Sequence, residues 1–318
     1  MKNIKPKSDD VVLKIELDSE ELMDFSEYQK QALKTDRIST EEDAAIIVPL
    51  LGLAGEAGEL LSEYKKFLRD GRSHKFFPER VAEELGDLLW YIANLSSKFK
   101  LNLEQIAEGN LKKCRDRWGV GDLGQLQVYI FDHEFPKKEC LPRQFEVEVT
   151  EVSENNSVKM RAFIKTKKKS KKIGNDLTDN SYASDGYRFH DIFHFSYAAV
   201  LGWSPVIRSN LQCKRKSNSS IDEVEDGGRA IAIEEGISAL VFSYAAKHSY
   251  LEEVSILDDQ LLATIKSMTL HLEVSQCSLC DWEKAILDGY KVWRQIEKNK
   301  GGKVIVDLDA RSIVYQEK

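Results

Sequence analysis

The sequence predicts a mainly α-helical protein with an N-terminal helical bundle and a C-terminal α+β domain that contains β-hairpins. Apolar residues recur every three to four positions over 46–68 and 81–95, as they do in amphipathic helices. Three glycines between 119 and 124 end this pattern, and an alternation typical of strands follows over 145–149 and 158–164. A length of 318 residues suits two domains.

The elements follow in order along the chain. We expect an N-terminal extension (1–21), a helical domain (22–119), a β-hairpin with a Lys-rich linker (120–185) and a C-terminal helical domain (186–318). Asn102 can cap a helix that runs to Trp118. Six lysines between Lys165 and Lys172 favour a solvated loop over a patch that steers anions. Residues 303–315 alternate around a turn, which predicts a hairpin that closes this domain.

Two pairs of acidic residues lie on predicted helices, Glu56 with Glu59 and Glu84 with Asp87. A spacing of three places both acids of a pair on one helix face. If the apolar stripes pack, four carboxylates meet and repel one another unless a cation neutralises them. Solvated helix faces also carry such pairs, but here apolar and small residues surround both. Oxygen-only ligation suits Mg²⁺, with Mn²⁺ as a substitute.

Glycines beside the acids, at positions 55, 58 and 86, are expected to let the helix backbones approach closely. Helical steps from the acids reach further polar residues, and a third helix adds more of them. These candidates for contacting a polyphosphate are Lys66, Tyr91, Asn94, Asn110, Lys113 and Arg117. All of them except Asn110 also have a structural alternative; for example, Tyr91 can be a core residue and Lys66 can pair with an acid on its own helix.

These motifs resemble those of a known family. Two segments, LGLAGEAGELL (51–61) and EELGDLL (83–89), look like those of MazG-like nucleoside triphosphate pyrophosphohydrolases, which belong to the all-α NTP pyrophosphatase superfamily. The residues that follow them match the same pattern, namely Asn94, Asn110, Lys113 and Arg117-Trp118. The segment FSEYQKQALKT (25–35) is similar to the first helix of many such chains. The resemblance covers about residues 22–119, and some 200 residues lie beyond it, similar to the C-terminal extension of longer relatives.

The resemblance implies Mg²⁺-dependent hydrolysis of a nucleoside triphosphate between its α and β phosphates, which gives the monophosphate and pyrophosphate. Its catalytic and metal-binding residues would be Glu56, Glu59, Glu84 and Asp87, with Glu59 as a candidate proton acceptor. Lys66, Lys113 and Arg117 would stabilise the leaving group, while Tyr91 and Asn94 would lie nearer the nucleoside.

A second polar cluster is expected in the C-terminal domain. His190 and His194 share a helix face at i and i+4, and Asp191, Glu234 and Glu235 are candidate neighbours. His190-Asp191 invites comparison with HD-type phosphohydrolases, but those need further His and Asp ligands that the sequence does not place. A structural role, in which the histidines hydrogen-bond to the glutamates inside an apolar bundle, or partner binding, is therefore favoured over a metal or phosphate site.

Composition narrows the remaining possibilities. A net charge of −7 gives no global signal for nucleic-acid binding. No uninterrupted apolar run approaches the ~18 residues of a membrane span, and residues 1–20 lack the apolar region of a secretory signal. Five scattered cysteines argue against a disulfide framework and favour the cytoplasm, and the single CxxC motif, Cys277 to Cys280, is read as structural.

A small helical domain buries little surface alone, so we expect a homodimer or a higher homo-oligomer. Other functions stay open: a nucleotide sensor or interaction module in stress or phage defence, with little turnover, or a bifunctional hydrolase with a second site around His190 and His194. Turnover of a nucleoside triphosphate separates an enzyme from a sensor.

Overall fold

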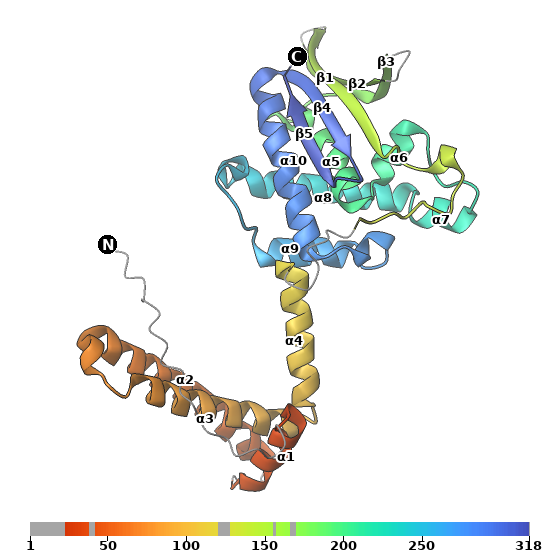
Figure 1. Ribbon diagram of the computed structural model, residues 1–318. Coiled ribbons are helices and arrows are strands. Elements are labelled where there is room, and N and C mark those ends of the chain that lie inside the picture. The colour runs from red at the N-terminus through yellow and green to blue at the C-terminus, as the bar shows by residue number, and fades with distance from the viewer. Residues whose placement is uncertain (1–22, 38–41, 120–127, 155–156, 166–169, 318) are drawn as a thin grey trace. The chain divides into compact units, whose positions relative to one another are not determined.

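The computed structural model describes residues 23–37, 42–119, 128–154, 157–165 and 170–317. It forms two compact units, 1–112 and 113–318, and each is described by itself (Figure 1). The predicted N-terminal extension (1–21) lies outside the described residues.

The first unit consists of helices, as predicted. The helices are α1 (Phe25–Thr35), α2 (Glu42–Asp70), a short 3-10 helix (Gly71–Ser73), α3 (Phe77–Lys98) and α4 (Leu103–Trp118), whose last turns belong to the second unit. The side chain of Gln29 fixes α1 to the connection between α3 and α4. Its amide nitrogen donates to Ser97 Oγ (3.1 Å) and to the carbonyl of Leu101 (2.9 Å), and its oxygen accepts from the backbone N–H of Leu103 (2.9 Å).

Few apolar side chains of the first unit are fully buried. Its described core consists of Ala32, Ala93 and Leu103, with Tyr28 and Trp90 packed against them. On α2, by contrast, one stripe at helical spacing is exposed, and its members are Ile47, Leu51, Ala54, Gly58, Leu61 and Leu68. The α2 and α3 helices pack against each other, but this stripe stays uncovered within the unit.

The glycine that permits close packing of α2 and α3 differs from those predicted. A Cβ added at Gly52 would lie 2.3 Å from the Tyr91 ring, so the ring rests directly on this backbone. A Cβ added at Gly55, Gly58 or Gly86 meets no atom within 4 Å. The prediction of close approach at these three glycines is therefore wrong for the single chain, because they face away from the contact between the helices.

The second unit contains a five-stranded antiparallel sheet. Its strands are β1 (Gln144–Glu154), β2 (Ser157–Lys165), β3 (Ser170–Leu177), β4 (Gly301–Asp307) and β5 (Ser312–Gln316), in the order β3-β2-β1-β4-β5. Both predicted hairpins are present, and β1 pairs with β4, so they form one sheet (Figure 1). Residues 120–185 and 186–318 thus contribute to the same unit. Lys171 and Lys172, expected in a solvated loop, belong to β3, and residues 166–169 lie outside the described part.

Helices cover the apolar face of this sheet. Those that contact it are α5 (Asp191–Leu201), α6 (Pro205–Leu211) and α10 (Leu279–Asn299). The helices α7 (Ser219–Val224), α8 (Gly228–Ala246) and α9 (Asp259–Met268) pack on other helices, and short 3-10 helices lie at 137–139, 187–189, 249–251 and 273–276. Every residue of α5 is buried, and α5 packs against α10, β4 and β5. Strand residues alternate, so that Val147, Val149 and Val304 are fully buried while their neighbours face outward.

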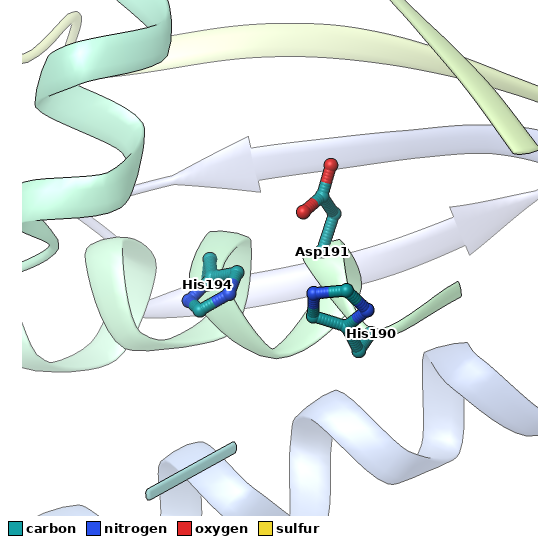
Figure 2. A group of neighbouring side chains, drawn as sticks. All are labelled: His190, Asp191 and His194. Atoms are coloured by element: carbon teal, nitrogen blue, oxygen red, sulfur yellow. The ribbon is translucent and has the colours of Figure 1, made fainter. Parts of the chain in front are cut away.

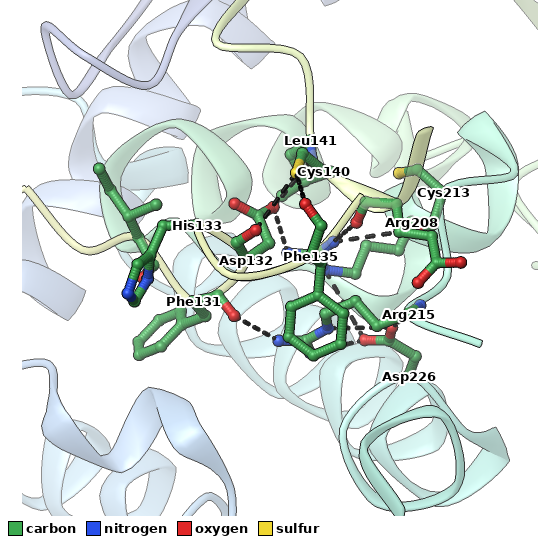
Figure 3. Close-up of polar contacts among 12 residues, drawn as sticks. Phe131, Asp132, His133, Phe135, Cys140, Leu141, Arg208, Cys213, Arg215 and Asp226 are labelled. Atoms are coloured by element: carbon green, nitrogen blue, oxygen red, sulfur yellow. Dashed lines mark hydrogen bonds and ion pairs between the residues drawn. The ribbon is translucent and has the colours of Figure 1, made fainter. Parts of the chain in front are cut away.

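A buried ion-pair network joins the segment before β1 to the helices (Figure 3). The Arg208 guanidinium donates to Asp132 Oδ2 (2.7 Å), and the Arg215 guanidinium donates to Asp226 Oδ1 and Glu273 Oε1 (2.7 Å each). Both arginines are 1% exposed, so their charges need these partners. The network ties parts of the chain that are more than 50 residues apart.

The five cysteines are free thiols, in line with the prediction against a disulfide framework. Cys277 ends the 3-10 helix at 273–276, and Cys280 lies in the first turn of α10. One described helix, Ala45–Ser73, is long and apolar enough to cross a membrane by length and composition. The search for an apolar run in the sequence did not find this segment, because Glu56 and Glu59 interrupt it. Charged side chains of this kind are unfavourable at the centre of a bilayer.

Candidate functional site

The structure brings three of the four predicted acids into one cluster. Glu56 of α2 and Glu84 and Asp87 of α3 each offer a carboxylate oxygen, and these oxygens lie within 4.8 Å of one another. Glu59 lies one turn further along α2, exposed, and close enough to act electrostatically on Glu84. The acid cluster (Glu56, Glu59, Glu84 and Asp87) therefore forms where α2 and α3 pack.

Within the described residues no cation forms an ion pair with the acid cluster, and Arg80 acts on Glu84 only electrostatically. The pKa of Glu84 is raised above its ordinary value, first of all by burial. A hydrogen bond with Glu56 and the negative charges of Glu56, Glu59 and Asp87 raise it further. Uncompensated carboxylate oxygens on two rigid helices suit a hard divalent cation such as Mg²⁺. The donor set thus fits the predicted cofactor.

Tyr91 and Asn94 follow Asp87 along α3. The Tyr91 ring packs on Gly52 and contacts Trp90 edge to face, with centroids 5.0 Å apart, so the core role considered for Tyr91 has structural support. Asn94 is fully buried, and neither atom of its amide has a hydrogen-bond partner among the described residues. A buried amide without a hydrogen-bond partner destabilises the folded state. The Asn94 amide is therefore available to form hydrogen bonds with a ligand.

Lys66 pairs with Glu63 of its own helix, the alternative that its sequence position allowed. The other oxygen of Glu63 lies 2.9 Å from His74 Nε2. Hydrogen bonding from Lys66 lowers the pKa of Glu63, against the effect of burial. Glu63 thus holds the Lys66 ammonium and the His74 ring beside the end of α2.

Tyr28 was not predicted as a site residue. Burial and, second, the negative charge of Asp87 raise the pKa of the Tyr28 hydroxyl, so α1 brings this side chain near the acid cluster. Only the packing of α1 on α3 reveals this, since 59 positions separate the two residues and no sequence spacing connects them.

The predicted substrate residues of α4 differ in their surroundings. Asn110 and Lys113 are exposed. Arg117 is 5% exposed, and its guanidinium contacts Asp259, Glu283 Oε2 (3.1 Å) and the carbonyl of Leu257 (2.8 Å) within the second unit. These three contacts engage each nitrogen of the guanidinium once, and substrate contact by Arg117 stays an untested prediction.

The second predicted cluster also assembles. His190, Asp191 and His194, at the start of α5, offer ligand atoms within 4.8 Å of one another (Figure 2). Glu235 of α8 lies 3.5 Å from the Nε2 atoms of both histidines, and Glu234 accepts a hydrogen bond from His194 Nδ1 (2.8 Å).

The charges in this cluster are strongly coupled. Burial alone would lower the pKa of His194, but the carboxylates of Glu234, Glu235 and Asp191 outweigh it and raise this pKa to about 10. Burial raises the pKa of Asp191, whereas hydrogen bonding from His190 and His194 lowers that of Glu235. The cluster therefore favours a bound positive charge.

Comparison with known proteins assigns both parts of the chain. Residues 49–119 match the family model of the MazG nucleotide pyrophosphohydrolase domain, and residues 126–318 match that of the MazG C-terminal domain. The chain is also similar to the Gene 37 protein of Mycobacterium phage L5, with 38% identity over 69 residues, which are 21% of this chain. It spans about 60% of the length of this curated relative. No solved structure matches the chain.

Proposed function

The chain belongs to the MazG family, and we propose that it is a Mg²⁺-dependent pyrophosphohydrolase that converts a nucleoside triphosphate, NTP or dNTP, to the monophosphate and pyrophosphate. The observation that carries this proposal is the convergence of Glu56, Glu84 and Asp87 within the segment that matches the pyrophosphohydrolase domain. Three carboxylates that form no ion pair with another described residue could hold a divalent metal, which would supply charge neutralisation for a phosphate group.

The residues of the chain have separate tasks in this proposal. Glu56, Glu59, Glu84 and Asp87 hold Mg²⁺, or Mn²⁺ in its place, which when bound neutralises phosphate charge and acidifies a water molecule. Glu59, exposed beside the other three acids, accepts the proton of the attacking water. The unpartnered amide of Asn94 and the Tyr91 ring orient the nucleoside. Lys66, Asn110, Lys113 and Arg117 remain candidates for binding the phosphates.

Product analysis tests the reaction directly. The full chain is incubated with Mg²⁺ and a panel of NTPs and dNTPs, and pyrophosphate is resolved from orthophosphate. We expect monophosphate and pyrophosphate, with kcat/KM reduced about 10²- to 10⁴-fold in Glu59→Gln and Glu84→Gln.

Glu83→Gln is the matched control, since Glu83 neighbours Glu84 on α3 but pairs with Arg80 at 2.7 Å. Release of orthophosphate, or equal activity in Glu84→Gln and Glu83→Gln, would contradict the proposal. Tight nucleotide binding without turnover would instead favour a nucleotide sensor.

We propose further that the active form is a homodimer or a higher homo-oligomer in the cytoplasm. The exposed α2 stripe supports self-association, because a second copy offers the same apolar surface. The free thiols support a reducing compartment.

A further inference from the structure

The cluster at the start of α5 is unusual in its position. His190 precedes the helix, Asp191 is its first residue and His194 lies one turn later (Figure 2). All three are less than 8% exposed and lie on a helix that is buried along its whole length. Ionisable groups in such surroundings need partners or a bound ion.

Both imidazole rings are oriented through Nδ1. His190 Nδ1 lies 2.8 Å from the carbonyl oxygen of Tyr187, and His194 Nδ1 lies 2.8 Å from Glu234 Oε1. Since a carbonyl oxygen only accepts, Nδ1 of His190 carries a hydrogen, and in the neutral form of the ring Nε2 then keeps a lone pair. Histidines that bind metals are commonly held this way, by a backbone carbonyl or a carboxylate on the other ring nitrogen.

Glu234 serves as such an orienting carboxylate and is itself held by three hydrogen bonds. Besides His194 it accepts hydrogen bonds from Ser204 Oγ (2.6 Å) and from the backbone N–H of Val206 (2.9 Å). It is fully buried, so these contacts replace its hydration.

The Nε2 atoms of both histidines converge on Glu235. Each lies 3.5 Å from Glu235 Oε2, and the buried Nε2 of His194 has no hydrogen-bond partner in the described part of the chain. This separation is at the limit of a hydrogen bond. It matches the roughly 3.4 Å edge of a tetrahedron whose metal–ligand bonds are about 2.1 Å.

We propose that His190, Asp191, His194 and Glu235 form a second metal site, which binds Zn²⁺ or another first-row divalent ion. Two imidazoles and two carboxylates suit such an ion, whereas the oxygen-only acid cluster suits Mg²⁺. The Glu235 side chain is 42% exposed, so an ion can enter from its side. The inference is independent of the proposed hydrolase activity.

The rival explanation is a proton in place of the metal. A charged His194 between Glu234 and Glu235 would also neutralise the cluster, and its ring nitrogens would then both donate. The two explanations differ in one measurable respect, namely whether a divalent ion binds and depends on these side chains.

Metal binding to the full chain decides between them. The background is the double variant Glu56→Gln with Glu84→Gln, which disables the acid cluster. Binding of Zn²⁺ to this protein is measured by calorimetry, and binding of Co²⁺ is followed by its visible absorption spectrum. We expect calorimetry to show about one bound ion per chain. The Co²⁺ spectrum should indicate nitrogen and oxygen ligands, without a thiolate charge-transfer band. Zn²⁺ binding should be at least 10-fold weaker after Glu235→Gln or His190→Gln.

Glu235→Gln is the informative variant because its side chain is 42% exposed and the substitution keeps its size while removing the charge. His248→Gln is the matched control, because His248 Nδ1 also lies 2.8 Å from a backbone carbonyl, that of Tyr244, but His248 is exposed and lies outside the cluster. Absent binding, a thiolate spectrum, or equal affinity in Glu235→Gln and His248→Gln would overturn the proposal.

Discussion

At the scale of single residues, burial separates charged side chains that are engaged by the fold from those that face solvent. Arg117 and Lys113 lie one turn apart on α4, yet the Arg117 guanidinium is enclosed by Asp259, Glu283 and the carbonyl of Leu257, while Lys113 is exposed. Their spacing in the sequence makes them equivalent, and only their surroundings distinguish them.

Arg117→Ala is expected to destabilise the second unit by about 3 kcal/mol, because it leaves Glu283 partly buried without its cation. Arg115→Ala, at an exposed position of the same helix, should change the free energy of unfolding by less than about 0.5 kcal/mol. Urea unfolding measures both. If Arg117→Ala instead left the stability unchanged and raised the KM, Arg117 would be a substrate-binding residue.

Asp281 is a second residue whose contacts come from distant segments. Its carboxylate accepts hydrogen bonds from Ser278 Oγ (2.7 Å) and Tyr129 Oη (2.8 Å) and pairs with the buried Arg311. Burial alone would raise the pKa of Asp281, but Arg311 and Ser278 lower it below its ordinary value of 3.8. The charged form is therefore the one that the fold stabilises.

Asp281→Asn is expected to lower the free energy of unfolding by about 3 kcal/mol at pH 7, since Arg311 loses its partner. A lowered folded-state pKa contributes stability above the unfolded pKa and loses it as pH falls through the folded value. Unfolding of both proteins at pH 7, 4 and 3 should thus show a difference that shrinks below pH 4. A difference that stays constant with pH would rule out the ion pair as its source.

At the scale of elements, the contact between α2 and α3 depends on the Tyr91 ring resting on Gly52. The glycine is needed for space, because any Cβ there would overlap the ring. The glycines at 55, 58 and 86 have no such role within the chain, and in a helix interior each costs about 0.5–1 kcal/mol relative to alanine.

Gly52→Ala is expected to destabilise the first unit by about 1–3 kcal/mol, because the Tyr91 ring must move. Gly55→Ala, one turn later, should instead stabilise it by up to about 1 kcal/mol in metal-free protein. Thermal unfolding measures both. In a Tyr91→Ala background the penalty of Gly52→Ala should vanish, and its persistence there would show that another contact is responsible.

At the scale of the whole molecule, the two units bury their apolar residues very differently. The second unit has a continuous core between the sheet and its helices, whereas the first unit leaves large apolar side chains of α2 exposed. A helical unit with so small a core gains stability by covering this surface with a second copy.

Leu61→Glu is therefore expected to convert the full chain from a dimer or higher oligomer to a monomer, because a charge would enter the shared apolar surface. Leu61 is 70% exposed and belongs to the α2 stripe. Leu270→Glu is the control, at a position that is 61% exposed in the second unit. Light scattering after gel filtration gives the mass, and a wild-type monomer would contradict the oligomer proposal.

The sequence by itself determined the helices of the first unit, both hairpins of the second and the residues of both candidate clusters. Local periodicity is sufficient for these, because an amphipathic helix or a hairpin depends mainly on its own side chains. Membership of the acid cluster also followed, since a spacing of three fixes a helix face.

Only the tertiary structure decided which residues meet across the chain. It joined the two hairpins through β1 and β4, placed Tyr28 near Asp87, gave the packing role to Gly52 and enclosed Arg117. It also showed that the Nε2 atoms of His190 and His194 converge on Glu235. These outcomes depend on how whole elements pack, and packing is set by the summed shape and burial of many side chains, which no local spacing encodes.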